Sequence, residues 1–215
     1  RIGTGNDLSL YHNGNSRITH GGAGNLIVET TATDSDLYLR GKDKVVIQPN
    51  DGEDGVICNA DGSVELYHNN IKTFYTDTYG AVVVAPEGGA AELQIWGDEG
   101  DDNNDKYMID VDSGRFRIKN YTSGSWETNI ECNGDGNVEL YYNDAKRAET
   151  TEFGFQVFGN LTIRDNVVFY IGDGNDLQIW HDGSNSIIKD DGAGDLHIRA
   201  ENFRVQNKEG THSMI

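Results

Sequence analysis

Residues 171–198, IGDGNDLQIWHDGSNSIIKDDGAGDLHI, decide the fold, because the chain opens with a near copy of them. The copy, residues 2–28, reads IGTGNDLSLYHNGNSRITHGGAGNLIV, and more than half of the paired positions are identical once one residue is inserted after Gly14. A stretch that recurs so far along the chain is a structural unit rather than an active site.

Each copy alternates apolar and polar residues in short runs, which Gly, Asn and Ser separate. In the later copy, residues 176–181 predict a first strand, Ile187 and Ile188 a second, and Leu196 with Ile198 a third. The unit is therefore predicted to be a small β-meander.

A second repeated block interleaves with the first. Residues 58–80, CNADGSVELYHNNIKTFYTDTYG, return as residues 132–154, CNGDGNVELYYNDAKRAETTEFG, with 12 of 23 positions identical. Within the first of these, residues 64–68 alternate as in a strand, Asn69 and Asn70 predict a hairpin turn, and residues 71–75 predict the returning strand.

Further short strands are predicted at residues 156–158, 161–164 and 167–171, and no window shows the apolar period of a helix. We therefore predict an all-β fold. Leu8, Leu93 and Leu177 mark three unit starts at almost equal spacing. The predicted repeat units are residues 1–90, 91–169 and 170–215. Both termini cut through the repeat, so we expect the first and third units to be truncated pieces of a longer polypeptide.

The string GDGNDLQIWHDGSNSIIKDDGAGDLHIRA, residues 172–200, resembles the repeat of tail fibre and related virion structural proteins of tailed bacteriophages, especially marine ones. So does VELYHNN, residues 64–70, which a lysine and threonines follow. The resemblance covers nearly the whole chain. It implies a fibre shaft that is assembled in the host cytoplasm and resides in the virion. The implied partners are further copies of the chain, other tail or fibre proteins and host surface glycans.

Strands this short would leave exposed edges and a thin core if the chain folded alone. The period from Leu8 to Leu93 is several times longer than that of a common solenoid. Apolar pairs such as Leu177 with Ile179, and Leu196 with Ile198, could instead meet on a threefold axis. We therefore predict an elongated, intertwined homotrimer, either a β-prism or a triple β-helix, which the fibre resemblance also implies.

The formal net charge is −19, from 17 Lys and Arg against 36 Asp and Glu. Such a surface repels phosphate backbones, so no nucleic-acid partner is predicted, and it discourages edge-to-edge pairing of strands. No run approaches the ~18 apolar residues that a membrane span needs, so no membrane insertion is predicted. Cys58 and Cys132 occupy equivalent repeat positions a full unit apart, which predicts small buried thiols without an intrachain disulfide.

Two kinds of residue are candidates for a metal site. Residues 98–105, DEGDDNND, offer the oxygens that Ca²⁺ takes but lack the order of an EF-hand loop, which favours a solvated hairpin tip. His12, His68 and His181 recur in strands, but Gly97 and Tyr142 replace them in other copies, which favours packing. The sequence therefore predicts no metal and no cofactor.

Trp126 is the one candidate ligand-binding residue. It lies in the loop-like stretch YTSGSWET, residues 121–128, without a counterpart in the other units. Because exposed aromatic rings bind the faces of sugars, we predict a glycan contact at Trp126. Trp96 and Trp180 share one repeat position, which predicts packing for them.

The chain has acids enough for many carboxylate pairs, but no Ser-His-Asp arrangement, nucleophile elbow, phosphate-binding loop or zinc spacing. We therefore predict that the chain is not an enzyme but a structural segment of a phage tail fibre or spike shaft that supports host attachment. Two alternatives stay open. One is a tailspike-like polysaccharide depolymerase, and the other is a non-viral adhesin or extracellular filament built from the same repeat.

Overall fold

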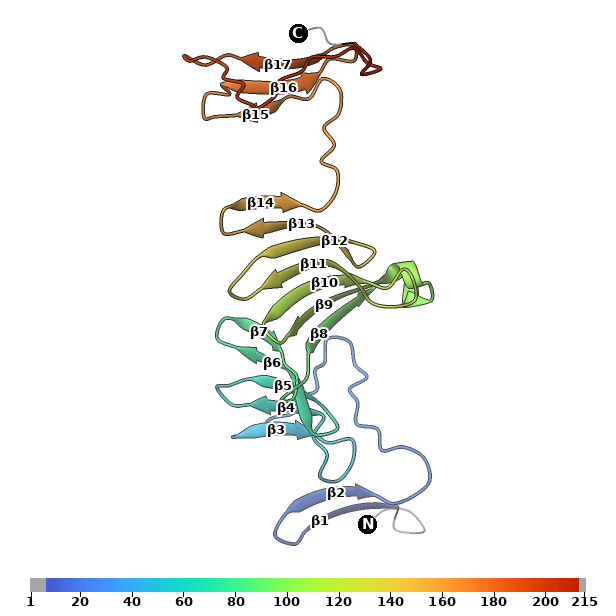
Figure 1. Cartoon of the computed structure of the whole chain (residues 1–215). Helices are drawn as coiled ribbons and strands as arrows, with labels where there is room; N and C mark the ends of the chain where they lie inside the picture. The colour runs from blue at the N-terminus through green and yellow to red at the C-terminus, as the bar shows by residue number, and fades with distance from the viewer. Residues whose placement is uncertain (1–6, 213–215) are drawn as a thin grey trace. The chain divides into compact units, whose positions relative to one another are not determined.

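A computed structural model describes residues 7–212, and this part of the chain is all-β, as predicted (Figure 1). The helical elements among these residues are two 3₁₀ turns, η1 (Asp98–Gly100) and η2 (Asn103–Asp105). No helix in this range is long and apolar enough to cross a membrane.

The strands form four open sheets. The smallest pairs β1 (Leu8–His12) with β2 (Ser16–His20). A five-stranded sheet follows chain order through β3 (Lys44–Ile47), β4 (Val56–Asn59), β5 (Val64–His68), β6 (Ile71–Asp77) and β7 (Gly80–Val83). A three-stranded sheet has the order β15 (Phe169–Ile171), β16 (Leu177–His181) and β17 (Ser186–Asp190).

The seven-stranded sheet also follows chain order. Its strands are β8 (Ala91–Trp96), β9 (Lys106–Asp112), β10 (Arg115–Asn120), β11 (Glu127–Asn133), β12 (Val138–Tyr142), β13 (Ala145–Thr151) and β14 (Gly154–Val157). The chain divides into two compact units, one with the residues up to Ile95 and Met108–Ser113, the other with Trp96–Tyr107 and the residues from Gly114 onward. The boundaries of the three predicted repeat units stay a prediction.

Each copy of the second repeated block lies in a five-stranded ladder, the first in β3 to β7 and the second in β10 to β14 (Figure 1). Once the two blocks are aligned, the bounds of β5, β6 and β7 coincide with those of β12, β13 and β14. The pairing coincides as well, since Leu66 lies opposite Phe74 and Leu140 lies opposite Ala148, and a β-bulge follows each pair. The matching registers confirm the predicted repeat at the level of individual hydrogen-bonded pairs.

Turn residues explain why these hairpins close where they do. Asn69 and Asn70 have φ of 49° and 61°, and Asn143 and Asp144 have φ of 49° and 54°. Two consecutive positive φ values make the type I′ turn that suits the twist of a hairpin, and Asn and Asp tolerate this region better than other residues with a side chain. The predicted turn at Asn69 and Asn70 is therefore confirmed.

The first repeated block also recurs as structure. Leu10 lies opposite Ile18 in the hairpin of β1 and β2, and the equivalent Ile179 lies opposite Ile188 in that of β16 and β17. One backbone bond closes each hairpin, from Gly21 N–H to the Asp7 carbonyl at 2.8 Å and from Asp191 N–H to the Asp176 carbonyl at 2.7 Å. The first two strands of the predicted meander are confirmed.

The prediction of a third strand in the meander is wrong. Residues 195–200, which include Leu196 and Ile198, belong to no strand, and the same holds for the equivalent residues 25–30. The predicted strand at residues 161–164 is likewise absent. These segments have the apolar alternation of strands, but a strand forms only where a neighbouring strand offers a hydrogen-bonded ladder, and in the described chain none does.

Candidate functional site

Each five-stranded ladder carries an apolar row of residues that lie directly opposite one another. Directly opposite residues share a face of the sheet. In the second ladder the row is Ile118, Ile130, Leu140, Ala148 and Val157. In the first ladder it is Ile47, Val56, Leu66, Phe74 and Val83. We call the side of each sheet that carries this row its apolar face.

The apolar faces are open. Leu66 and Leu140, at the middle of their rows, are each 41% exposed. The buried hydrophobic residues among those described are Ile57, Met108 and Ala148, and Ala148 is the buried member of the second row. Cys58 and Cys132 also lie on the apolar faces, opposite Val64 and Val138, and carry free thiols. They are half-buried rather than buried as predicted.

The exposed area shows how much surface is left uncovered. The chain exposes 17,198 Å², whereas a compact monomer of 23.7 kDa would expose about 9,800 Å². Even two separate compact globules of half that mass would expose only about 11,900 Å², which leaves roughly 5,300 Å² in excess. An excess of this size is comparable to the surface that obligate protein assemblies bury.

The opposite face of the second ladder carries a hydrogen-bonded polar network around Glu139, which is 8% exposed. Its carboxylate accepts hydrogen bonds from the Tyr141 hydroxyl, from Lys146 Nζ at 2.8 Å and from Asn137 Nδ2 at 2.8 Å. Lys146 also reaches Glu149 Oε2 at 2.9 Å. Lys146, Tyr141 and Asn137 together lower the pKa of Glu139, despite its burial.

The first ladder repeats this network at the equivalent positions. Glu65 accepts hydrogen bonds from the Tyr67 hydroxyl at 2.5 Å, from the Ser63 hydroxyl at 2.9 Å and from Lys72 Nζ at 3.2 Å. These donors, Tyr67 foremost, lower the pKa of Glu65. The hydrogen bond to Glu65 raises the pKa of Tyr67 to about 12. Burial and the hydrogen bond to Glu139 raise the pKa of Tyr141, also to about 12.

In both networks a glutamate with a lowered pKa is held by hydrogen bonds from a tyrosine hydroxyl and a lysine amino group. Each network acts as a clamp between neighbouring strands, because the glutamate lies on one strand and the lysine on the next. Sequence reasoning missed them. The signal was present, because the pattern Glu-x-Tyr with a lysine at the seventh position after the glutamate occurs in both blocks, at Glu65 and at Glu139.

Shallow grooves recur with the repeat. One of about 490 Å³ is lined in part by residues 61–63 and 76–78, and one of about 370 Å³ by the equivalent residues 135–137 and 150–152. Each groove lies where a turn meets the ends of two strands, β5 and β6 in the first ladder and the equivalent β12 and β13 in the second. The groove therefore recurs because the ladder recurs. A third groove, of about 480 Å³, is apolar and includes Phe169, Ile179 and Ile188 in its lining.

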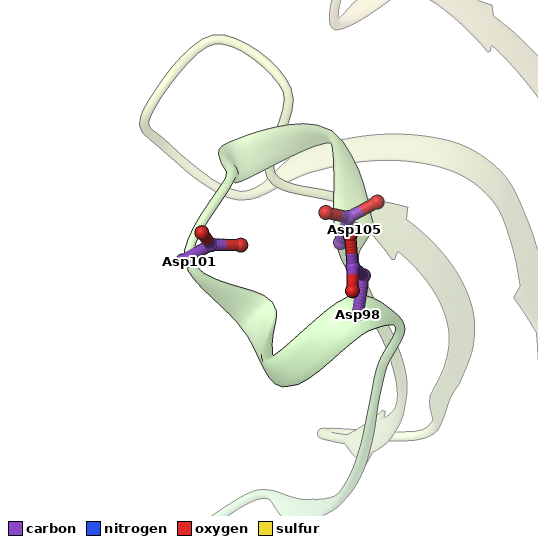
Figure 2. A group of neighbouring side chains, drawn as sticks. All are labelled: Asp98, Asp101 and Asp105. Carbon is purple, nitrogen blue, oxygen red and sulfur yellow. The ribbon is translucent and has the colours of Figure 1, made fainter.

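The acidic loop contains a cluster of three carboxylates, Asp98, Asp101 and Asp105 (Figure 2). Each offers an oxygen that lies within 4.8 Å of the others. Calcium takes six to eight oxygens, and Asp98 and Asp101 are exposed while Asp105 is half-buried, so the cluster alone does not establish a calcium site. The loop is mostly exposed and connects the neighbouring strands β8 and β9, in agreement with the predicted hairpin tip.

Trp126 is half-buried in the loop before β11, where its ring meets that of Tyr121 edge to face, with centroids 5.1 Å apart and planes at 62°. Lys106 Nζ lies 5.7 Å from the Tyr121 ring centroid and 5.6 Å from that of Trp96. Trp126 therefore has a packing role within this loop. The glycan contact predicted for it stays a prediction.

Two of the three recurrent histidines, His12 and His181, contact serines of their own hairpins. His12 Nδ1 lies 3.1 Å from Ser16 Oγ, and the equivalent His181 Nδ1 lies 3.2 Å from Ser186 Oγ. Comparisons of the chain with protein-family models, with curated proteins and with solved structures found no match.

Proposed function

We propose that this chain is a shaft segment of a tail fibre or spike in the virion of a tailed bacteriophage, assembled as a homotrimer. The observation that carries the proposal is the open apolar face, which recurs in the same register on two successive five-stranded ladders. A sheet with one uncovered apolar face is stable once another layer covers it. Identical faces on identical copies can cover one another around a common axis.

In this arrangement the role of the protein is mechanical, and the chain catalyses no reaction. Three copies turn their apolar faces inward, as a β-prism or a triple β-helix. The opposite faces, which carry the networks around Glu65 and Glu139, then point away from the axis. The strand ladders give the shaft stiffness, and the number of repeats sets its length.

We propose a location in the virion because residues 172–200 and 64–70 resemble phage fibre repeats. On the same basis the partners are further copies of the chain and other tail or fibre proteins, with assembly in the host cytoplasm. A shaft of this kind holds a receptor-binding tip away from the particle, and its sides, including Trp126, contact host surface glycans.

Immunogold electron microscopy with antibodies against this protein tests the proposal. Label along the tail fibres of phage particles is expected. Label on filaments of uninfected bacterial cells would instead identify an adhesin. Hydrolysis of host capsular polysaccharide by the purified protein would identify a depolymerase, with two carboxylates about 5 to 9 Å apart as its catalytic pair.

A further inference from the structure

We propose that the third strand of each meander is supplied by a neighbouring copy of the chain. Residues 195–200 add to the outer edge of β17 in the next protomer, and residues 25–30 add to the outer edge of β2. The inference rests on the proposed homotrimer and names the segments that join its chains.

The first support is that both copies of the meander leave the same segment unpaired. In each copy a glycine-containing bend, residues 22–24 or 192–194, follows the second strand, and a segment outside any strand comes next. Leu26 and Leu196, which are equivalent in the repeat, are both 47% exposed. The two copies of the meander differ in almost half of their positions, yet both keep an apolar, strand-like sequence here. In neither copy does this segment pair with the sheet of its own meander.

The second support is that the sheets offer open edges next to unfinished apolar rows. β17 is the last strand of its sheet, and β2 is one of two strands in its own. Such an edge presents backbone N–H and C=O groups to an incoming strand, which binds through the ladder and through its alternate side chains. In the three-stranded sheet the row is Phe169, Ile179 and Ile188.

An antiparallel strand placed with Ile198 opposite Ile188 would extend that row by one member. The equivalent register in the first copy places Val28 opposite Ile18. It also places Glu29 directly opposite Arg17, and opposite charges facing each other across a strand pair are favourable. The register therefore satisfies an apolar and an electrostatic criterion in the same pairing.

The partner comes from a second copy because the chain does not pair the segment with its own sheet. Among residues 7–212 no strand contains residues 25–30 or 195–200. Their leucine and isoleucine side chains are exposed, and they contribute to the surface area that the chain exposes beyond that of compact globules of the same mass. Pairing in trans covers these side chains and the sheet edges together.

A cross-linking experiment separates pairing in trans from pairing in cis. The variant carries Lys189→Cys and His197→Cys, which face each other in the proposed register, in a Cys58→Ala/Cys132→Ala background. A bifunctional maleimide, whose reach tolerates a small register shift, links the thiols in the assembled protein. Denaturing gels then show whether the link joins different chains, and the single variants Lys189→Cys and His197→Cys are the controls.

We expect covalent dimers and trimers from the double variant only, together with slowed amide hydrogen exchange of residues 195–200 relative to the loop at residues 122–125. Light scattering on the same sample gives the number of chains. A trimer whose links lie within one chain, or whose residues 195–200 exchange as fast as the loop or give no link, would overturn the inference and leave the proposed function standing. A monomer would overturn both.

Discussion

A charge placed in the apolar row tests whether that row lies inside an assembly. We choose Leu140→Glu, because Leu140 lies at the centre of the row on β10 to β14. In the single chain the residue is 41% exposed, so the new carboxylate stays hydrated and the fold of one chain loses little. In an assembly that covers the apolar face, the same carboxylate is removed from water without a partner.

The expected magnitude follows from these two effects. Loss of the leucine contact that assembly would complete costs about 1 kcal/mol, since full burial of such a side chain contributes roughly 1.5–3 kcal/mol and about two fifths of it remains exposed. An unpaired carboxylate in the interface adds about 3 kcal/mol. With three copies on the axis the sum is about 12 kcal/mol, which weakens trimer formation by roughly nine powers of ten.

Sedimentation velocity at micromolar concentration measures the effect. The matched control is Gln156→Glu, which adds the same charge on the opposite face of the same sheet, next to Glu149. We expect Leu140→Glu to sediment as a single chain and Gln156→Glu to sediment as a trimer. If Leu140→Glu forms the same assembly as the control, the apolar face is not the contact between chains and the reasoning is refuted.

Three further changes test the polar networks and the turns. Tyr141→Phe should lower the free energy of unfolding in urea by about 2 kcal/mol, because Glu139 loses a hydrogen bond to a charged group, whereas Tyr142→Phe at the neighbouring exposed residue should change little; equal effects would contradict the proposed clamp. The urea midpoint should be highest at intermediate pH. The pKa values of Glu65 and Glu139 are lowered, so their contribution to stability is present above the usual value of 4.5 and is lost as the pH falls below it. The pKa values of Tyr67 and Tyr141 are raised from 10.0 to about 12, so their contribution to stability is lost as the pH rises from 10 to 12. A flat profile would count against both networks. Asn69→Ala should cost about 1 kcal/mol because its φ is 49°, and Asn69→Gly should cost nothing measurable, with unfolding in urea again the measurement; equal losses would contradict the turn type.

The sequence predicts local structure well in this chain, because the information lies in short-range patterns. Alternation in residues 64–68 and the asparagines at 69 and 70 are enough to place a hairpin and its turn. The return of the same block at residues 132–154 then predicts the second hairpin. The same reasoning fails at Leu196 and Ile198, where the alternation is equally good but the neighbouring strand is absent from the described chain.

The polar networks illustrate a different limit. In the strand of residues 64–68, alternation separates Leu66 from Glu65, but it does not say which side of the sheet is covered. In the described chain the apolar side is the open one. That Glu65 pairs with Lys72 depends on the register across the hairpin, which the constant spacing of glutamate and lysine in both blocks could have indicated.

The mass of the protein in solution tests most directly whether copies of the chain assemble and cover one another's apolar faces. Multi-angle light scattering on the purified chain should give three times the 23.7 kDa of one chain. A stable, monodisperse particle with the mass of a single chain would contradict the account, because the open apolar faces would then have no need of a partner.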